Sequence, residues 1–235
     1  MNNFDAQDYH ILVVDDDHLI LRMVGDALED AGFQVVTHLS GEAALKHIKR
    51  HGLPHLAVVD INMPFGMDGF EFCEAVHQFS DLPIIMLTAV DADETIINAL
   101  DYHVEDYITK PFSPGELGAR VRRVLRRIGD FSYTLDPITK VDEQLAVDFG
   151  NQRIFIADNV ISLTPTENKL LHILMRNAGH TVTSEFIVRR LWPYDTIPDD
   201  RLRVYIHRLR HKIEQTPKKP KYIISQRGIG YIFVI

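Results

Sequence analysis

The sequence predicts two modules, an α/β module built on a doubly wound parallel sheet and a smaller α+β module that follows it. In the first half, short β-branched runs alternate with segments of helical periodicity, and in the second half strand-like runs flank three helical segments. The charge divides in the same way: residues 1–126 hold 9 Lys+Arg and 21 Asp+Glu, whereas residues 127–235 hold 16 and 12. This asymmetry predicts an acidic module joined to a basic one suited to a polyanion.

The overall composition is that of a folded globular protein. Of the 235 residues, 46% are hydrophobic and 25% are charged, which excludes an intrinsically disordered chain. The apolar runs are far shorter than the ~20 residues that span a bilayer, and the polar N-terminus is unlike a secretory signal. Cys73 is the only cysteine, so neither an internal disulfide nor a thiolate metal site is expected. These features predict a cytoplasmic protein without a membrane segment.

Five strands and five helices alternate in the first module. Strands are expected at 11–14, 34–37, 57–59, 83–87 and 107–109, where β-branched residues cluster. Apolar residues at helical spacing follow each strand, at 19–28, 44–48, 72–76, 96–100 and 117–125. The fifth helix opens with Ser113, Pro114 and Glu116, the pattern of a capping box with proline at the first helical position. Ligands of such sheets bind beyond the carboxyl ends of the strands.

Polar residues stand at those strand ends. Three aspartates at 15–17 follow the first strand, and Asp60, Thr88 and Lys110 follow the third, fourth and fifth. Converging carboxylates repel one another and need a cation, and an all-oxygen site suits Mg²⁺. A carboxylate is also a nucleophile toward a phosphoryl group, for which Thr88 supplies a hydroxyl and Lys110 a positive charge. Each residue alone is commonly just solvated, but the whole set in this order indicates phosphoryl chemistry.

Over about residues 8–127, the chain resembles the receiver domain of two-component response regulators, a flavodoxin-like (βα)5 fold. The matching text is ILVVDDD at the start, VVDINMP around Asp60, IIMLTA at Thr88, and DYITKPF around Lys110. The resemblance implies that a sensor histidine kinase phosphorylates Asp60 and that Thr88 and Tyr107 form a switch pair. It also implies a Mg²⁺ site made by Asp15, Asp16, Asp60 and the backbone carbonyl of Asn62.

Two departures from the receiver pattern lie near functional positions. Phe65 and Gly66 both stand between the Met-Pro and Met-Asp-Gly of a loop that usually has one residue there. This insertion beside Asp60 is expected to alter access to the site or autodephosphorylation. His103 stands where the family favours glycine, so the fourth helix, which the family uses for dimerisation, is expected to end differently.

The second module is predicted to be a winged helix-turn-helix. Short strands are expected at 144–149, 153–156 and 160–163, and a closing pair at 222–225 and 231–234 around a glycine turn. Thr164 and Glu167 form a second capping-box pattern, at the start of a helix that is expected to end at Gly179. Further helices are expected at 184–191 and from Asp199 to about Glu214.

The third helix of this module carries the predicted DNA contacts. Its apolar residues, expected to be mostly buried, are Leu202, Val204, Ile206, Leu209 and Ile213. A basic helical face is commonly just solvated, but three helices followed by a basic hairpin place the third helix in the major groove. Over residues 142–235, the chain resembles the effector domain of OmpR/PhoB-type regulators, through LTPTENKLLHILMRNAGHTVTSE, VYIHRLRHKIE and RGIGYIF. The implied contacts to double-stranded DNA are Arg201, Arg203, Tyr205, His207, Arg208, Arg210 and Lys212 on the helix and Arg227 at the wing.

Together these features predict a phosphorylation-dependent, sequence-specific transcriptional regulator that is not an enzyme, with residues 128–141 as its linker. The implied partners are a sensor histidine kinase, double-stranded DNA, RNA polymerase, and a second copy that pairs through the receiver on phosphorylation. Two alternatives remain open. A haloacid-dehalogenase-type phosphatase would use Asp15 as nucleophile and Asp17 as acid–base, and a protein-interaction adaptor would dock its basic module on an acidic partner.

Overall fold

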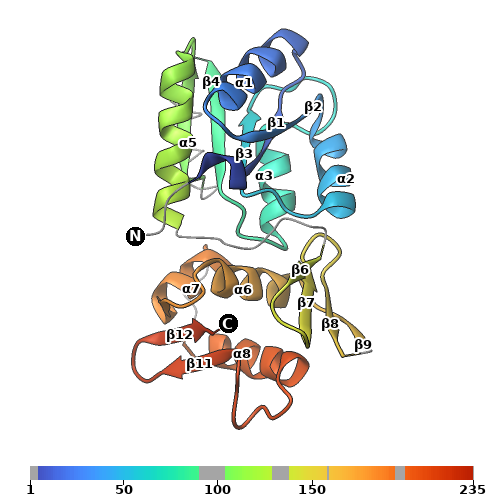
Figure 1. Ribbon diagram of the computed structural model, residues 1–235, viewed down its shortest axis with the longest axis vertical. Coiled ribbons are helices and arrows are strands. Elements are labelled where there is room, and N and C mark those ends of the chain that lie inside the picture. The colour runs from blue at the N-terminus through green and yellow to red at the C-terminus, as the bar shows by residue number, and fades with distance from the viewer. Residues whose placement is uncertain (1–4, 90–103, 129–137, 158, 194–198, 235) are drawn as a thin grey trace. The chain divides into compact units, whose positions relative to one another are not determined.

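A computed structural model describes residues 5–89, 104–128, 138–157, 159–193 and 199–234. The chain separates into two units, one formed mainly by residues up to 128 and the other mainly by residues from 138 onward. Figure 1 shows that each unit has its own strands and helices.

A five-stranded parallel sheet forms the centre of the first unit (Figure 1). Its strands are β1 (His10–Val14), β2 (Gln34–His38), β3 (Leu56–Asp60), β4 (Ile84–Ala89) and β5 (Asp106–Lys110), in the order β2-β1-β3-β4-β5. The register pairs Asp60 with Leu87 and Thr88 with Thr109, so the carboxyl ends of β3, β4 and β5 meet at one edge. The predicted flavodoxin-like sheet is therefore confirmed.

Helices cover both faces of this sheet (Figure 1). They are α1 (His18–Asp30), α2 (Gly41–His51), α3 (Gly69–His77) and α5 (Pro114–Ile128), and a 3-10 turn, η1 (Ala6–Asp8), precedes β1. Leu28 of α1 and Val121 of α5 belong to one buried apolar cluster, whereas α2 packs with α3 on the other face. The helix predicted at 96–100, and His103 after it, lie outside the described residues.

Local side-chain contacts set where two of these helices begin. Ser40 caps α2, because its hydroxyl accepts from the Ala43 N–H at 3.2 Å. At α5, the Ser113 hydroxyl accepts from the Glu116 N–H at 3.2 Å, but the Glu116 carboxylate pairs with Arg120. The predicted capping box of α5 is thus only half formed, since a cation one turn along the helix competes for the carboxylate.

The second unit contains two small antiparallel sheets. The first orders β6 (Thr139–Lys140), β7 (Leu145–Asp148), β8 (Arg153–Ile156) and β9 (Asn159–Ser162). The second has β12 (Gly230–Phe233) at its centre, between β10 (Thr181–Thr183) and β11 (Ile223–Gln226). The sequence does not predict β6 and β10, because strands of two and three residues are too short to show alternation.

Three helices complete this unit: α6 (Pro165–Arg176), α7 (Ser184–Leu191) and α8 (Asp199–Ile213). The capping box of α6 is confirmed. Thr164 Oγ1 accepts from the Glu167 N–H at 3.3 Å, and Glu167 Oε2 accepts from the Thr164 N–H at 2.8 Å. The helix ends at Arg176, three residues before the predicted Gly179.

The core side of α8 differs from the prediction at one residue. Leu202, Ile206, Leu209 and Ile213 are buried, but Val204 is 46% exposed. The expectation that these residues are mostly buried is confirmed, and Val204 is the exception, because residues two positions apart on a helix point to nearly opposite sides. Val204 is two positions from both Leu202 and Ile206, and therefore faces away from the core.

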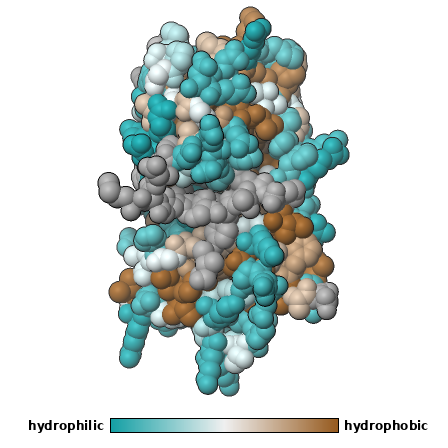
Figure 2. Space-filling view, in the orientation of Figure 1, coloured by the Kyte–Doolittle hydropathy of each residue, from teal (hydrophilic) through white to brown (hydrophobic). Residues whose placement is uncertain are grey.

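The surface is mostly hydrophilic on the side shown in Figure 2, with hydrophobic residues in separate patches on both units. Among the large exposed apolar side chains are Phe65 after β3, Val204 on α8 and Ile229 in the β11–β12 turn. No helix in the described ranges is both long enough and apolar enough to cross a membrane.

Candidate functional sites

The residues predicted at the strand ends meet at the carboxyl edge of the first unit's sheet. Asp15 follows β1, Asp60 ends β3 and Thr88 lies near the end of β4, and all three side chains are buried. Carboxylate oxygens of Asp15, Asp16 and Asp60 lie within 4.8 Å of one another. Ionised carboxylates at this spacing repel one another, so the cluster suits a hard divalent cation that prefers oxygen ligands.

Lys110 neutralises part of that charge. Its Nζ lies 2.9 Å from Asp15 Oδ2 and 2.8 Å from Asp60 Oδ1. Burial raises the pKa of Asp60; Lys110 opposes this rise, and the charges of Asp15 and Asp16 add to it. Desolvation alone would lower the pKa of Lys110, but its hydrogen bonds to Asp15 and Asp60 outweigh this and raise it. One ammonium bound to two of the three neighbouring carboxylates leaves excess negative charge in the pocket.

The third aspartate of the run has a different role. Asp17 is exposed, and its Oδ1 accepts from the Leu19 N–H at 2.7 Å, which makes it the N-cap of α1. Its own N–H donates to Asp15 Oδ1 at 2.9 Å. Asp17 therefore begins a helix and holds Asp15 in place, an arrangement that does not favour the acid–base role required of it in a haloacid-dehalogenase-type phosphatase.

The loop between β3 and α3, which contains the inserted residue, is held by close packing at Gly69 and by a hydrogen bond at Met67. Gly69 passes so close to the end of β3 that a Cβ at this position would collide with the Asp60 carbonyl. Phe65 is 83% exposed, while the Met67 N–H donates to Glu42 Oε1 on α2 at 2.8 Å. Sequence reasoning missed Glu42, because its partner is 25 residues away in the chain.

The other predicted receiver residues lie around this pocket. Thr88 Oγ1 donates to the Ala89 carbonyl at 3.2 Å, so the hydroxyl is engaged with its own backbone neighbour. The Tyr107 side chain is 37% exposed, and Asn62, two residues after Asp60, is exposed as well. The predicted switch pair thus combines a buried hydroxyl with a ring at the surface.

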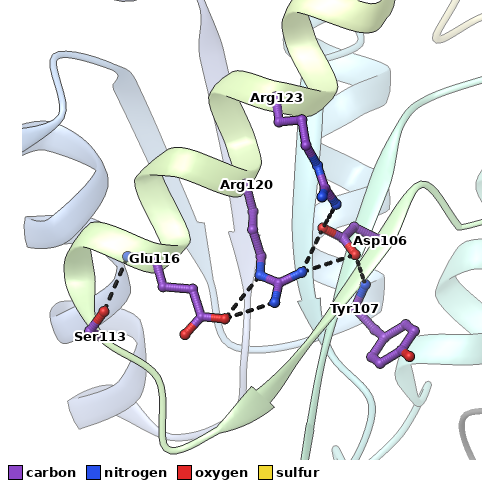
Figure 3. Close-up of polar contacts among 6 residues, drawn as sticks. All are labelled: Asp106, Tyr107, Ser113, Glu116, Arg120 and Arg123. Atoms are coloured by element: carbon purple, nitrogen blue, oxygen red, sulfur yellow. Dashed lines mark hydrogen bonds and ion pairs between the residues drawn. The ribbon is translucent and has the colours of Figure 1, made fainter.

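An ion-pair network joins β5 to α5 beside Tyr107 (Figure 3). Asp106 accepts from Arg120 at 3.2 Å and from Arg123 at 2.6 Å, and also from the Tyr107 N–H at 3.0 Å. Arg120 is held a second time, by Glu116 at 2.8 Å. In Figure 3 the Tyr107 ring points away from the two arginines. Sequence reasoning missed the contacts of Asp106 with the two arginines, because Asp106 lies on β5 and the arginines lie on α5.

In the second unit, α8 presents a basic face to solvent. The exposed residues of this helix include Asp200, Arg201, Arg203, Val204, His207, Arg208 and His211. The exposed face thus combines cations, which contact phosphates, with one apolar side chain of a size that contacts a thymine methyl. This is the surface chemistry expected of a helix that enters the major groove.

Two of the predicted DNA-contacting residues are engaged inside the unit instead. Arg210 donates to the Ile223 carbonyl from Nε at 3.0 Å and from Nη2 at 2.6 Å, which ties α8 to β11. Lys212 Nζ lies 2.8 Å from Glu167 Oε2, which ties α8 to α6. Burial lowers the pKa of Arg210, as expected for a guanidinium withdrawn from water. In the sequence, Arg210 and Lys212 look like the other basic residues of α8, and only the folded structure shows that their side chains are engaged within the unit.

Two of the exposed arginines lie against aromatic rings. The Trp192 and Tyr205 ring centroids are 5.4 Å apart. The guanidinium of Arg201 lies 4.8 Å from the Trp192 centroid, and that of Arg208 lies 5.5 Å from the Tyr205 centroid. Cation–π contacts at these distances restrain both side chains, which lowers the entropy that they lose when they bind a ligand.

Glu214 fixes the start of the wing, and sequence reasoning missed it. Its buried Oε1 accepts from the Tyr222 and Ile223 N–H groups, both at 2.9 Å, and its Oε2 accepts from the Lys221 N–H at 2.6 Å. One carboxylate thus holds three backbone donors of the segment that enters β11. In the sequence, the one unusual feature of Glu214 is that it is an acidic residue directly after a basic helix, and this does not reveal its partners.

The wing is the turn between β11 and β12. Arg227 is exposed on this turn, and the Ser184 N–H donates to the Ile229 carbonyl at 3.0 Å. Gly230 lies so close to β10 that a Cβ there would collide with the Val182 carbonyl. Arg227 therefore projects from a turn whose backbone is fastened to neighbouring elements.

Comparisons with known proteins identify the family of each unit. Residues 11–122 match the family model of the response regulator receiver domain, and residues 158–233 match that of the transcriptional regulatory protein, C terminal. The KDP operon transcriptional regulatory protein KdpE of Escherichia coli is 34% identical, with 96% of this chain and 99% of that protein covered. The alkaline phosphatase synthesis transcriptional regulatory protein PhoP of Bacillus subtilis is 36% identical, with 94% and 95% covered.

A solved structure also spans both units. The Thermotoga maritima response regulator DrrB, an OmpR/PhoB homologue, is 31% identical, with 96% of this chain and 99% of that chain covered and a TM-score of 0.46. KdpE and PhoP, which are at least 34% identical over almost the whole chain, determine the family together with a family model on each half. The chain belongs to the OmpR/PhoB-type response regulators, and is a two-component transcriptional regulator with a receiver domain and a C-terminal DNA-binding domain.

Proposed function

We propose that Asp60 is the phosphoacceptor and that a sensor histidine kinase is its donor. The observation that carries this is a buried carboxylate at a strand end, 2.8 Å from the ammonium of Lys110 and grouped with two further carboxylates. Asp15 and Asp16 lie in the same group but are not favoured as nucleophiles. Asp15 already accepts a hydrogen bond from the Asp17 N–H, and Asp16 is less buried than Asp60.

The reaction follows from the chemistry of these groups. A carboxylate oxygen of Asp60 attacks the phosphorus of a phosphohistidine, an O–P bond forms as the P–N bond breaks, and the imidazole leaves with a proton. Lys110 holds the Asp60 carboxylate before attack and pairs with a phosphoryl oxygen afterward. The rise in the Asp60 pKa makes its ionised form less stable, which strengthens the carboxylate as a nucleophile.

The acidic group fits Mg²⁺, because its donors are all oxygen and carry more negative charge than Lys110 neutralises. The proposed ligands are Asp15, Asp16, Asp60 and the backbone carbonyl of Asn62. When bound there, Mg²⁺ supplies positive charge that stabilises the oxygens of the transferred phosphoryl group.

We propose that Thr88 and Tyr107 transmit the modification. The Thr88 hydroxyl would leave the Ala89 carbonyl for a phosphoryl oxygen, and the Tyr107 ring would move inward. Tyr107 adjoins the Asp106–Arg120–Arg123 network at the β5–α5 surface (Figure 3), so its movement would alter a charged surface. This supports homodimerisation through the receiver on phosphorylation. RNA polymerase is proposed as a partner on the family alone.

For the second unit, we propose that α8 reads DNA in the major groove and that Arg227 contacts DNA from the wing. Arg203, Val204, His207 and Arg208 are the favoured reading residues, because they are exposed on one helix. Arg201 and Tyr205 are proposed as flanking contacts. Arg210 and Lys212, proposed earlier as DNA contacts from the sequence, are better supported as braces that hold α8 to β11 and α6.

The limits proposed for the domains are 8–127 for the receiver, 128–141 for the linker and 142–235 for the DNA-binding domain. The last receiver helix, α5, ends at Ile128, next to the first limit. On the other side, β6 begins at Thr139 and pairs with β7. This pairing supports a linker that ends a few residues earlier, before β6.

The test of the phosphoacceptor uses labelling by acetyl phosphate with Mg²⁺ present. Asp60→Asn is nearly isosteric, and should abolish labelling while the fold survives. Asp17→Asn is the matched control, since it changes a neighbouring aspartate that serves as a helix cap. Labelling of the Asp17 variant should persist, and EDTA should abolish labelling of the wild type. Labelling retained in Asp60→Asn but lost in Asp15→Asn would instead support the phosphatase alternative, in which Asp15 is the nucleophile.

A further inference from the structure

A second group of ligand-type side chains lies away from the acidic pocket, along α2 and the strands beneath it. It consists of His38 at the end of β2, and of His47 and His51 one turn apart on α2. The ring centroids of His38 and His47 are 4.8 Å apart, and those of His47 and His51 are 4.5 Å apart with nearly stacked planes. We call these three residues the histidine cluster.

Within the described residues, no protein group forms a hydrogen bond with the ring nitrogens of the histidine cluster. Nε2 of His38 is buried and makes no hydrogen bond. For His47 and His51, the contacts found within the described residues are ring contacts with other histidines. A buried polar atom without a partner is destabilising, so it points to a ligand that the protein chain does not provide.

A pocket adjoins the histidine cluster. Its volume is about 270 Å³, and its walls are His10, Ile11, Leu12, Val36, His47, His51, Gly52, Leu53 and Pro54. The polar side chains of this wall are imidazoles, and the rest of the wall is apolar or backbone. A ligand that enters here therefore meets nitrogen donors and no carboxylate, the reverse of the chemistry around Asp60.

We propose that His38, His47 and His51 bind one divalent transition-metal ion of the class that prefers imidazole ligands, such as Zn²⁺. Two histidines four residues apart on a helix project from the same face, and a third from the adjacent strand completes a three-nitrogen site. Imidazole nitrogens favour Zn²⁺, Ni²⁺ or Cu²⁺ over Mg²⁺. The cluster is therefore chemically distinct from the oxygen site in the same unit.

The protonation and geometry of the cluster bear on how the metal binds. Burial, together with the charges of the neighbouring His38 and His51, lowers the pKa of His47 to about 4. At neutral pH this imidazole is uncharged, which is the form that coordinates a metal. Among the described residues, the oxygens of Asp15, Asp16 and Asp60 form a group within 4.8 Å, whereas the three imidazoles do not. The proposal therefore requires that the side chain of His38 or His51 rotates when the metal binds.

The chain supplies its own matched control. His207 and His211 on α8 have the same spacing of four residues, with ring centroids 4.1 Å apart. Nδ1 of His211 already lies 2.9 Å from the His207 carbonyl, and within the described part of α8 and its neighbours no third histidine ring contacts this pair. Two ligands bind a metal more weakly than three, so the histidine cluster should bind first.

The experiment is isothermal titration of the full chain with Zn²⁺ in excess Mg²⁺, with Asp60→Asn as a second background that weakens the oxygen site. Both proteins should bind one Zn²⁺ tightly. His47→Gln or His51→Gln should weaken that site by at least about 10- to 100-fold, the range known for loss of a supporting metal contact. His207→Gln should leave the site unchanged. Zn²⁺ should also raise the unfolding midpoint of every protein in this set except the His47 and His51 variants.

Other outcomes overturn the proposal. If the wild type binds no Zn²⁺, or if its affinity is the same in His47→Gln and His51→Gln, the three rings are only an aromatic stack. Loss of binding in His207→Gln would move the site to α8, and loss in Asp60→Asn alone would assign it to the oxygen cluster. Because His51 is exposed, its variant should fold even if the His47 variant does not. Zn²⁺ binding by Asp60→Asn would also show that the histidine site does not depend on the role of Asp60 as phosphoacceptor.

Discussion

Asp60 and Glu167 are nearly matched carboxylates that the two units use in opposite ways. Both are buried, and each lies 2.8 Å from a lysine ammonium, Lys110 for Asp60 and Lys212 for Glu167. Yet the pKa of Asp60 is raised, first by burial, whereas that of Glu167 is lowered, because its hydrogen bonds from Lys212 and Thr164 outweigh its desolvation.

The difference lies in what else surrounds each carboxylate. Glu167 also accepts from the Thr164 N–H at 2.8 Å, and closes a capping box. Asp60 instead shares its lysine with Asp15 and lies within 4.8 Å of two like charges. A carboxylate with sufficient donors stabilises the fold, whereas one with too few remains available to a cation and to an electrophile. The contrast indicates that a lysine at hydrogen-bond distance does not by itself mark a structural ion pair.

The largest expected effect tests how rigidly Asp60 is held. Gly69→Ala should destabilise the first unit by about 3 kcal/mol, because the new Cβ would collide with the Asp60 carbonyl and the backbone has to shift. Gly115→Ala is the control, since no atom lies within 4 Å of a Cβ at that helical position. The control should be stabilised by about 0.5–1 kcal/mol. Urea unfolding of both variants measures the difference, and equal midpoints would mean that the loop yields freely.

Glu167→Gln tests the carboxylate that has a structural role. It should destabilise the second unit by about 2 kcal/mol at neutral pH, because a charged hydrogen bond is lost on each side of the carboxylate. A folded-state pKa below the unfolded value contributes stability that is present above the unfolded pKa and lost as the pH falls through the folded pKa. The gap between wild type and variant should therefore close in acid. Unfolding curves at a series of pH values report this, and a gap independent of pH would refute it.

Asp60→Asn should change the free energy of unfolding in the opposite direction from Glu167→Gln, and by a smaller amount. A folded-state pKa above the unfolded value contributes stability that is present below the unfolded pKa and lost as the pH rises through the folded pKa. Without Mg²⁺, the variant should be more stable than wild type at neutral pH, and the gain should vanish below about pH 4, near the ordinary pKa of aspartate. Excess Mg²⁺ should stabilise the wild type more than the variant. A variant less stable than wild type at neutral pH without Mg²⁺ would contradict the comparison.

The smallest effect concerns the exposed face of α8. Val204→Ala removes two methyl groups from an exposed side chain, so the fold should be almost unaffected. If Val204 contacts a thymine methyl, preference at one base pair should fall by about 1 kcal/mol. Selection from randomised DNA measures this preference. Arg210→Ala is the contrast, because it should reduce stability without altering the selected sequence.

The same contrast explains how far the sequence could predict the molecule. Alternating strands and helices, with charged residues at the strand ends, predicted the sheet and brought Asp15, Asp60 and Lys110 together, because topology alone aligns the carboxyl ends of parallel strands. The roles of Arg210 and Lys212 depend instead on β11 and α6, elements separated from them in the chain. Sequence periodicity predicts that both residues lie on a helix, but it does not predict which other element their side chains contact.

Smaller discrepancies have the same origin. Val204 was assigned to the core by its hydrophobicity, although its position on the helix places it with Arg203 and Arg208. Glu214 and Glu42 bind backbone N–H groups of other segments, and no local motif marks such a contact. The histidine cluster combines one strand residue with two helix residues, so only the packing of α2 on β2 reveals it.

The central claim, that chemistry at Asp60 controls DNA reading by α8, is tested most directly by one affinity measurement. Fluorescence anisotropy with a DNA site selected by the wild type gives the Kd of the full chain with Mg²⁺, before and after addition of beryllofluoride. The wild type should bind at least about tenfold more tightly after the addition, within the range of coupling between linked sites. Asp60→Asn should bind with the same Kd in both conditions, because beryllofluoride needs the carboxylate. Equal tightening in the variant, or none in the wild type, would contradict the claim.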